Sequence, residues 1–274
     1  CEYHMRYWPH AFQIPVHWHD EVEIIYVRKG PLMVEIDGQK FIGDDGAVYI
    51  VSPGVLHMMA APETPVDYFT FLFPMEFISF QTKDELEDEI FFPLRNHTRE
   101  FRPEVTNRNL LEKLVPILDE LSEENGKFGT HRQIQVRIRL LQVVDLLVEY
   151  DQLEAKTGRA SGGLEKEILI YIQDNYHEHI SLAELSEHFH LSEKYMSRFF
   201  SERFHMTLTQ YVNYVRLKYA RHLLESTDLS VTEIAMKSGY PHVSYFIRKF
   251  SAAVGEPPLR YRNRKAVKDQ KNRI

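Results

Sequence analysis

Residues 181–200 read SLAELSEHFHLSEKYMSRFF, and residues 230–250 repeat the same pattern as SVTEIAMKSGYPHVSYFIRKF. The serine and glutamate that open the first stretch recur 49 positions later, whereas the later matches recur 50 positions later. This one-residue difference falls between helices, where insertions are tolerated. Two copies of a short helix-turn-helix unit predict a chain that reads two adjacent turns of DNA. The matched residues at the offset of 50 are Tyr195, Arg198, Phe200 and Tyr211 with Tyr245, Arg248, Phe250 and Tyr261.

Each repeat begins with a helix-start signal and continues to a tight turn. Ser181 and Ser230 are each followed three residues later by Glu, the capping-box spacing that satisfies backbone N–H groups of a first helical turn. In the second repeat Gly239 supplies a residue that tolerates left-handed backbone angles. In the first repeat His190 occupies that place, which His can adopt at some cost. The pattern predicts a short first helix followed by a turn.

The second helix of each pair is expected to lie in the major groove. We expect the first to begin at Ser192 and the second near Pro241, since proline suits a first helical turn. Arg198 and Arg248 hold matched positions, and arginine bound to guanine is the commonest specific base contact. Residues expected to face inward are Tyr195, Phe199, Phe200, Tyr245, Phe246 and Phe250. Those expected to face outward are Glu193, Lys194, Ser197, Arg198, His242, Val243, Ser244, Ile247 and Arg248.

Between the repeats, residues 209–226 are predicted to form one continuous helix. Val212, Val215, Tyr219 and Leu223 follow one another at helical spacing. Such a helix spans roughly 25 Å at 1.5 Å per residue. It would serve as a strut that sets two reading helices about one DNA turn, roughly 34 Å, apart.

Residues 165–263 resemble the DNA-binding domain of AraC-type transcription regulators, the arabinose-regulator family. Where that family often has a glycine matching Gly255, this chain has His205. The alternative is that the repeats are structural or bind a protein, but two units, a strut and a basic bias together disfavour it. The matching residues are 192–200, Arg216, Leu217, Ala220, Leu223, Leu224, Ile234, Ala235, Gly239, Tyr240, Ser244, Tyr245, Phe246, Phe250, Gly255, Pro257 or Pro258, Tyr261 and Arg262. The resemblance implies that the base readers are Lys194, Ser197, Arg198, Ser244, Ile247 and Arg248.

Charge divides the chain at the same place as the repeats do. The whole chain has a net charge of −7, but residues 164–274 carry 17 Lys and Arg against 13 Asp and Glu, so that segment is net +4 and residues 1–163 are net −11. The basic half is the one suited to nucleic acid. With a modest positive charge, we expect specific contacts to matter and binding to weaken with salt.

Cysteine content and hydropathy bear on the compartment. The single Cys, Cys1, excludes an intrachain disulfide and fits a reducing compartment, so a cytoplasmic protein is expected. No apolar run is long enough for a membrane span, and no signal-peptide core is evident, so no membrane partner is expected. The chain begins with Cys1 rather than Met, which leaves room for a preceding segment.

Residues from about 10 to 75 are predicted to form short β-strands. The expected strands are 23–28, 32–36, 39–42, 47–51 and 67–73, and Asp37-Gly38 is a strong hairpin signal. Phe69, Phe71 and Phe73 should share one face of the last strand. After Pro103 the period becomes helical, and residues 104–154 predict a helical hairpin that covers the sheet, forms a dimer interface, or does both. Its two apolar stripes are Leu110, Leu114, Leu118 and Leu121, and Ile134, Ile138, Leu141 and Val148.

The predicted fold is therefore α+β with two domains. A β-barrel or sandwich is expected over residues 1–103, followed by the hairpin over 104–154. Residues 155–163 contain three glycines and no apolar period, so they are predicted to form a flexible linker. Residues 164–274 form the all-α pair of helix-turn-helix units.

The N-terminal domain contains a cluster of histidines. His17, His19 and Glu23 are followed by His57 after Pro53-Gly54; on a strand, His17 and His19 share one face, and Glu23 shares it if the strand continues. This set resembles cupin motifs, and the resemblance implies a cupin-like effector-binding domain over residues 1–103. Three imidazoles and one carboxylate suit a divalent transition metal. The other interpretation, given more weight because the second motif is imperfect, is that these residues contact a small polar effector directly, most plainly a carbohydrate. Trp8 and Trp18 would then stack on a sugar ring, or else simply pack.

Together these features predict a transcription regulator rather than an enzyme. It would bind double-stranded promoter DNA as a homodimer, respond to a sugar-like effector and, if an activator, recruit RNA polymerase. The flexible linker would let effector binding reorient the DNA-binding domains, by no more than the effector's differential affinity allows. The alternatives are a cupin-type metal-dependent enzyme fused to a DNA-binding domain and a sensor of the metal itself; no cofactor is certain.

Overall fold

The computed structural model of the chain describes residues 2–8, 12–61, 65–80, 84–123, 129–156 and 163–271, with side chains from residue 13 to residue 264 of those ranges. The chain divides into two compact units, Cys1–Gly163 and Leu164–Ile274, each with a hydrophobic core of its own. Within the described ranges, none of the helices combines the length and the apolar character that crossing a membrane requires.

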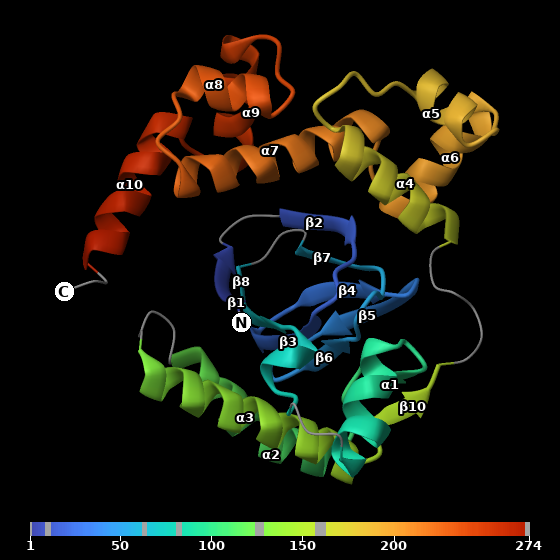
Figure 1. Ribbon diagram of the computed structural model, residues 1–274, viewed down its shortest axis with the longest axis vertical. Coiled ribbons are helices and arrows are strands. Elements are labelled where there is room, and N and C mark those ends of the chain that lie inside the picture. The colour runs from blue at the N-terminus through green and yellow to red at the C-terminus, as the bar shows by residue number, and fades with distance from the viewer. Residues whose placement is uncertain are drawn as a thin grey trace. The chain divides into compact units, whose positions relative to one another are not determined.

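The first unit contains two four-stranded antiparallel sheets, as the predicted sandwich requires (Figure 1). One has the strand order β1 (Glu2–Trp8), β8 (Val66–Phe73), β3 (Val22–Lys29), β6 (Val48–Val51), and the other has the order β2 (Phe12–His17), β7 (His57–Ala61), β4 (Leu32–Ile36), β5 (Gln39–Gly43). Asp37 and Gly38 both have positive φ angles, 50° and 76°, as a two-residue hairpin turn demands.

The first sheet is buried on both of its faces. Side chains such as Ile25 and Val27 of β3 pack toward the second sheet in one core. Ile24 and Tyr26, one position out of phase, pack on the other side, against helices. The predicted grouping of the phenylalanines of β8 on one face is confirmed, because all three belong to this helix-facing core.

Helices α2 (Arg108–Glu123) and α3 (Thr130–Glu149) cover that outer face and confirm the predicted helical hairpin (Figure 1). The leucine stripe of α2 is buried as expected. The stripe predicted on α3 does not cover the sheet, since Ile134, Ile138 and Val148 are 51%, 45% and 40% exposed; its use as a dimer interface stays a prediction. The apolar residues of α3 itself are distributed around most of the helix, so periodicity alone did not single out the packed face. That face consists of Val136, Leu140, Val143, Val144 and Leu147.

Short elements complete the first unit. They are η1 (Met75–Phe77), a π-helical turn η2 (Glu87–Phe91), α1 (Phe92–Arg95), and the paired strands β9 (Arg99–Phe101) and β10 (Leu153–Ala155). Of the predicted linker, Ala155 is the last residue of β10, because its strand pairs with Arg99 of β9. Residues 157–162 lie outside the described residues.

The second unit is entirely helical. Its helices are α4 (Gly163–Asn175), α5 (Leu182–His188), α6 (Glu193–Phe204), α7 (Leu208–Ser226), α8 (Val231–Lys237), α9 (Val243–Val254) and α10 (Pro258–Lys271). The predicted strut is α7, one residue longer at its start, where Thr207 and Gln210 form a capping box of their own. The helix pair α5–α6 lies at one end of α7 and the pair α8–α9 at the other (Figure 1).

Candidate DNA-reading helices and buried histidine cluster

Both helix-turn-helix units form through the local signals predicted from the sequence. Ser181 and Ser230 make complete capping boxes with Glu184 and Glu233 at the starts of α5 and α8. The turns that follow contain His190 and Gly239, with φ angles of 55° and 78°. The sequence therefore specifies both turns, although the first one uses a residue less suited to that conformation than glycine.

The two second helices, α6 and α9, also end alike. His205 ends α6 in the left-handed region at φ 53°, as Gly255 ends α9 at φ 85°. Ser192 caps α6 as expected, with its side chain accepting a hydrogen bond from the backbone of Tyr195. Pro241 was wrongly expected in the first turn of α9: His242 is the N-cap and the helix begins at Val243, so the proline lies before the cap.

The outer face of each second helix carries the six residues that the resemblance assigns to base reading. All six are exposed: Lys194, Ser197 and Arg198 on α6, and Ser244, Ile247 and Arg248 on α9. Arg198 is 69% exposed and lies 3.9 Å from Glu202, a long surface pair that costs little to break. The Arg248 guanidinium lies 5.3 Å from the Tyr245 ring centre. Their roles in DNA reading remain predictions.

The inward faces differ from the prediction at three positions. Phe200, Phe246 and Phe250 are buried as expected, but Tyr195 is 39% exposed, and Phe199 and Tyr245 are only partly buried. The residues that replace Tyr195 and Phe199 in the core of α6 are Met196 and Phe204, one turn apart from Phe200 on the same face. Tyr195 instead lies against Phe199 on the outer side, with ring centres 5.8 Å apart and nearly parallel planes.

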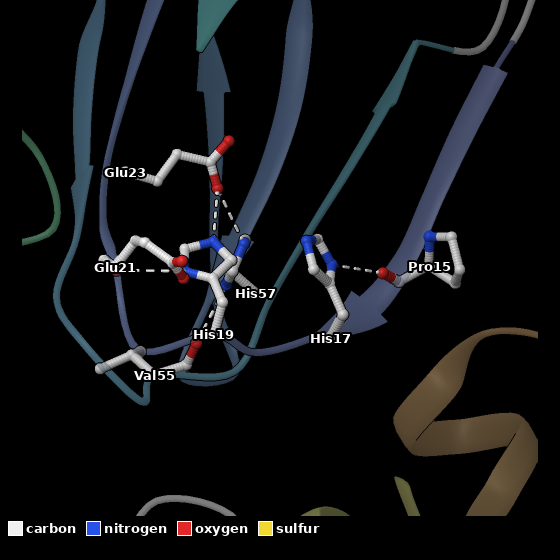
Figure 2. Close-up of polar contacts among 7 residues, drawn as sticks. All are labelled: Pro15, His17, His19, Glu21, Glu23, Val55 and His57. Carbon is white, nitrogen blue, oxygen red and sulfur yellow. Dashed lines mark hydrogen bonds and ion pairs between the residues drawn. The ribbon is translucent and has the colours of Figure 1, made fainter. Parts of the chain in front are cut away.

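In the first unit, four predicted side chains meet between the two sheets (Figure 2). His17 ends β2 and is paired across the strands with His57, which begins β7. Glu23 would share a strand face with His17 only if that strand continued, and it does not: β2 stops at His17, and Glu23 enters from β3 of the opposite sheet. His19 lies in the connection between them. Ligand atoms of all four side chains lie within 4.8 Å of one another.

Each imidazole is held by a backbone carbonyl through its Nδ1 atom. His17 Nδ1 is 2.9 Å from the Pro15 oxygen, His19 Nδ1 is 3.0 Å from the Glu21 oxygen, and His57 Nδ1 is 2.9 Å from the Val55 oxygen, as Figure 2 shows. A carbonyl can only accept, so each Nδ1 carries the proton. Neutral rings would then present the lone pair of Nε2. This is the orientation that second-shell hydrogen bonds give to metal-binding histidines.

The carboxylate of Glu23 binds two of these rings. Its Oε2 atom lies 2.9 Å from His57 Nε2 and 3.2 Å from His19 Nε2. Burial alone would raise the pKa of Glu23, but the two imidazoles outweigh that effect and hold it far below its usual range. Glu23 is therefore an anion in a nearly solvent-free site.

The two flanking histidines respond oppositely to this environment. Burial, with the nearby His57, sets the pKa of His17 well below its ordinary value, so this ring is neutral and its Nε2 can bind a ligand. Burial also disfavours the charged form of His19, but its bond to Glu23 and the carboxylate's charge raise its pKa overall. The cluster thus contains one anion, Glu23, one neutral imidazole, His17, and a second imidazole, His19, whose charged form the carboxylate favours.

The four side chains fit a divalent transition metal on these grounds. Imidazole nitrogens and a carboxylate oxygen are suitable donors, and two ligands about 2.1 Å from one ion lie at most about 4.2 Å apart. The observed spread of up to 4.8 Å exceeds that by a few tenths of an ångström, which side-chain rotation can close. Trp18, one of the two tryptophans predicted to stack on a sugar ring or to pack, lies between His17 and His19 in the sequence and is partly buried. The side chain of Trp8 lies outside the described residues.

The chain thus combines two helix-turn-helix units, each with an exposed second helix, and a β-sandwich that contains a buried polar cluster. A family described as "Helix-turn-helix domain" matches residues 185–264, and one described as "Cupin domain" matches residues 3–71. The predicted resemblance to AraC-type transcription regulators is therefore confirmed, because the chain combines a helix-turn-helix match with a cupin match and its relatives are HTH-type transcriptional regulators.

Relatives extend over nearly the whole chain. The uncharacterized HTH-type transcriptional regulator YdeC of Bacillus subtilis is 27% identical over 91% of this chain and 86% of its own length. The HTH-type transcriptional activator RhaS of Klebsiella pneumoniae is 25% identical over 86% of this chain and 83% of its own. Among solved structures, the C-terminal domain of the response regulator yesN from Fusobacterium nucleatum has 33% identity over 36% of this chain and 96% of that chain, with a TM-score of 0.35. The named relatives are regulators, in agreement with the expectation that the chain is not an enzyme.

Proposed function

We propose that this regulator responds to a small polar effector, most plainly a carbohydrate, bound at His17, His19, Glu23 and His57. The observation that carries the proposal is the cluster itself: buried imidazoles and a carboxylate converge between two sheets of a chain that also bears two reading helices. Packing alone does not call for a buried anion with several hydrogen-bonding rings, since such groups are costly to bury. Hydroxyl groups both donate to a carboxylate and accept from an imidazole, so they suit this site.

A paired measurement of ligand binding and DNA binding tests the proposal. Promoter DNA is first obtained by in vitro selection with the full chain, and a panel of monosaccharides and hydroxy acids is then screened by thermal shift. We expect one carbohydrate class to raise the Tm and to change the affinity for the selected DNA. Glu23→Gln, which keeps the size of the side chain but removes its charge, should lose both responses. A panel in which hydroxy acids alone act would contradict the carbohydrate assignment.

A divalent transition metal is a second candidate for the same four residues. The specific observation is that all three histidines donate through Nδ1 and leave Nε2 for the centre of the cluster. A bound metal would act there as a Lewis acid that holds the oxygens of an effector. Metal and carbohydrate binding are therefore compatible, and the metal alone would be the signal in a metal sensor.

A homodimer is proposed through the exposed face of α3. Ile134, Ile138 and Val148 are two-fifths to one-half exposed, and Leu141 lies in the same stripe; Asp145 adds one charge to it. An apolar stripe of this length on a helix whose opposite face is already packed is suited to a second copy of the same helix. Because α3 also packs on the sheet of its own protomer, such an interface would connect the N-terminal domains of the two protomers directly.

Changing the centre of this stripe should abolish dimerisation. We expect Ile138→Asp to convert a dimer to a monomer in light scattering, because a carboxylate buried against a second apolar stripe is strongly disfavoured. Gln133→Asp, exposed near the start of α3 and about 140° around the helix from Ile138, is the matched control. An Ile138→Asp protein that remains dimeric would place the interface elsewhere.

We infer activation as the output, since a relative is named a transcriptional activator. The proposed partner is RNA polymerase, and the proposed compartment is the cytoplasm, where both polymerase and promoter DNA are found. Transcription in vitro from the selected promoter, with and without effector, tests this output.

A further inference from the structure

The two helix-turn-helix units are carried on different halves of α7. Phe200 and Phe204 of α6 pack on Tyr211, in the first turn of that helix. Ala220 and Leu224, in its last two turns, belong to the core that holds α8 and α9. If α7 were the only connection, bending of this 19-residue helix would change the separation of α6 and α9.

Arg216, near the middle of α7, makes a second connection. Its Nε atom donates to the Tyr176 carbonyl at 2.6 Å, and its Nη2 atom donates to the Glu178 carbonyl at 2.7 Å. Both carbonyls lie just after α4, in the segment that leads into α5. The guanidinium carbon is also 5.6 Å from the ring centre of Tyr240, which follows the turn of the second unit. The half-buried side chain of Arg216 thus contacts segments of both helix-turn-helix units.

The backbones of the two helix-turn-helix units also approach each other at this point. A Cβ atom on Gly239 would lie 2.8 Å from the Tyr176 carbonyl oxygen and 2.9 Å from His177 Cα, distances at which real side chains are not found. Gly239 therefore serves two needs: its φ of +78° forms the turn, and its missing side chain lets the α4–α5 connection pass directly against that turn. The Tyr240 hydroxyl extends the contact to Asn213 of α7.

We propose that Arg216 and Gly239 clamp the two helix-turn-helix units together, and that this clamp fixes the separation and orientation of α6 and α9. The protein then discriminates the spacing between the two half-sites that these helices read. The inference rests on DNA reading by α6 and α9. Each inserted base pair moves one half-site by about 3.4 Å and rotates it by roughly 34°, so only rigidly held readers would detect it.

Distance measurements in the free protein test the clamp without DNA. Spin labels are attached to Ser197→Cys on α6 and Ser244→Cys on α9 in a full chain carrying Cys1→Ser. We expect one narrow distance distribution for this protein. Arg216→Gln should broaden the distribution, because the two carbonyls lose their guanidinium donor. Lys218→Gln, an exposed cation on the same helix, removes an equal charge and should leave the distribution narrow. An equally narrow distribution in Arg216→Gln would overturn the clamp.

Binding to spacing variants then tests what the clamp does. On selected DNA, one inserted base pair between half-sites should cost the wild type about tenfold or more in affinity, the equivalent of about 1.4 kcal/mol. For Arg216→Gln this penalty should fall below about threefold, while affinity for the original spacing also falls. An unchanged penalty in a folded variant would refute the proposal. Failure of the wild type to select any DNA would instead refute DNA reading itself, whatever the distances show.

Gly239→Ala provides an independent variant should Arg216→Gln fail to fold. The added methyl group must push the Tyr176 segment away, so we expect the same loss of spacing discrimination. Gly255→Ala is its control: it also has a positive φ, of 85°, but no heavy atom lies within 4 Å of the added carbon, so it carries the backbone strain without the crossing contact. Equal spacing penalties in the two alanine variants would contradict a role for the crossing.

Discussion

If the second candidate for the cluster holds, protein purified without a metal-chelating tag is expected to contain about one divalent transition metal ion per chain, held by His17, His19, Glu23 and His57. The expectation follows from the three Nδ1 hydrogen bonds, which fix the rings with Nε2 toward the centre, and from the carboxylate that faces them. Elemental analysis by mass spectrometry measures this content directly. Substitution of the histidine ligands is expected to abolish the metal content completely.

The control must distinguish the cluster from adventitious binding by other histidines. His17→Ala combined with His19→Ala should contain no metal, whereas the double variant His131→Ala/His179→Ala should keep it, since both of those residues are exposed and outside the cluster. Glu23→Gln, which keeps nearly the same side-chain volume, should retain less metal than the wild type. A wild type with no metal after growth in zinc-, iron- and manganese-supplemented media, but with an intact fold, would contradict this candidate and leave the direct effector site.

The DNA-binding unit was largely predictable because its signals are local. A serine followed by glutamate three residues later specifies a helix start through its own hydrogen bonds, and both boxes form as predicted. His190 and Gly239 likewise take positive φ angles at the predicted turns. Inward-facing residues were harder, because Tyr195 and Met196 differ by only one position and both can fill a core. Which of them packs depends on the tertiary partner, α7.

Sequence patterns were less informative about the first unit, where contacts between distant segments decide. Strand β7 reads HMMAA and contains no β-branched residue, so propensity did not indicate it; pairing with β2 and β4 makes it a strand. The packed face of α3 was not predicted for the same reason, since the sheet beneath decides which apolar residues are covered.

The histidine cluster was predicted in membership but not in construction. A single continuous strand would have placed Glu23 on the same face as His17, yet the carboxylate comes from the opposite sheet. Motif spacing captured residues that the fold assembles, without showing how. The clamp at Arg216 was not predicted at all, because hydrogen bonds to backbone carbonyls 38 and 40 residues away leave no pattern in the sequence.

Replacing the two matched arginines is expected to weaken specific DNA binding strongly. Arg198→Ala and Arg248→Ala should each cost about 1–3 kcal/mol on selected DNA and relax the preference at one base pair. The two lie on different reading helices, so the double variant should lose about 2–6 kcal/mol if the losses add. Fluorescence anisotropy on the selected site and on single-base variants of it measures both quantities.

The matched control for charge is Arg203→Ala, an exposed arginine at the end of α6 that pairs with Glu165 of α4. It should change affinity on all sequences alike, if at all, because a phosphate contact carries no base preference. Arg198 and Arg248 differ from it in lying in the first half of their helices, beside Ser197 and Ile247 on the exposed face. If Arg198→Ala and Arg248→Ala leave both affinity and base preference unchanged, the assignment of α6 and α9 as reading helices is wrong. If they lower affinity equally on every sequence, the arginines bind phosphate, and Lys194, Ser197, Ser244 and Ile247 must supply the specificity.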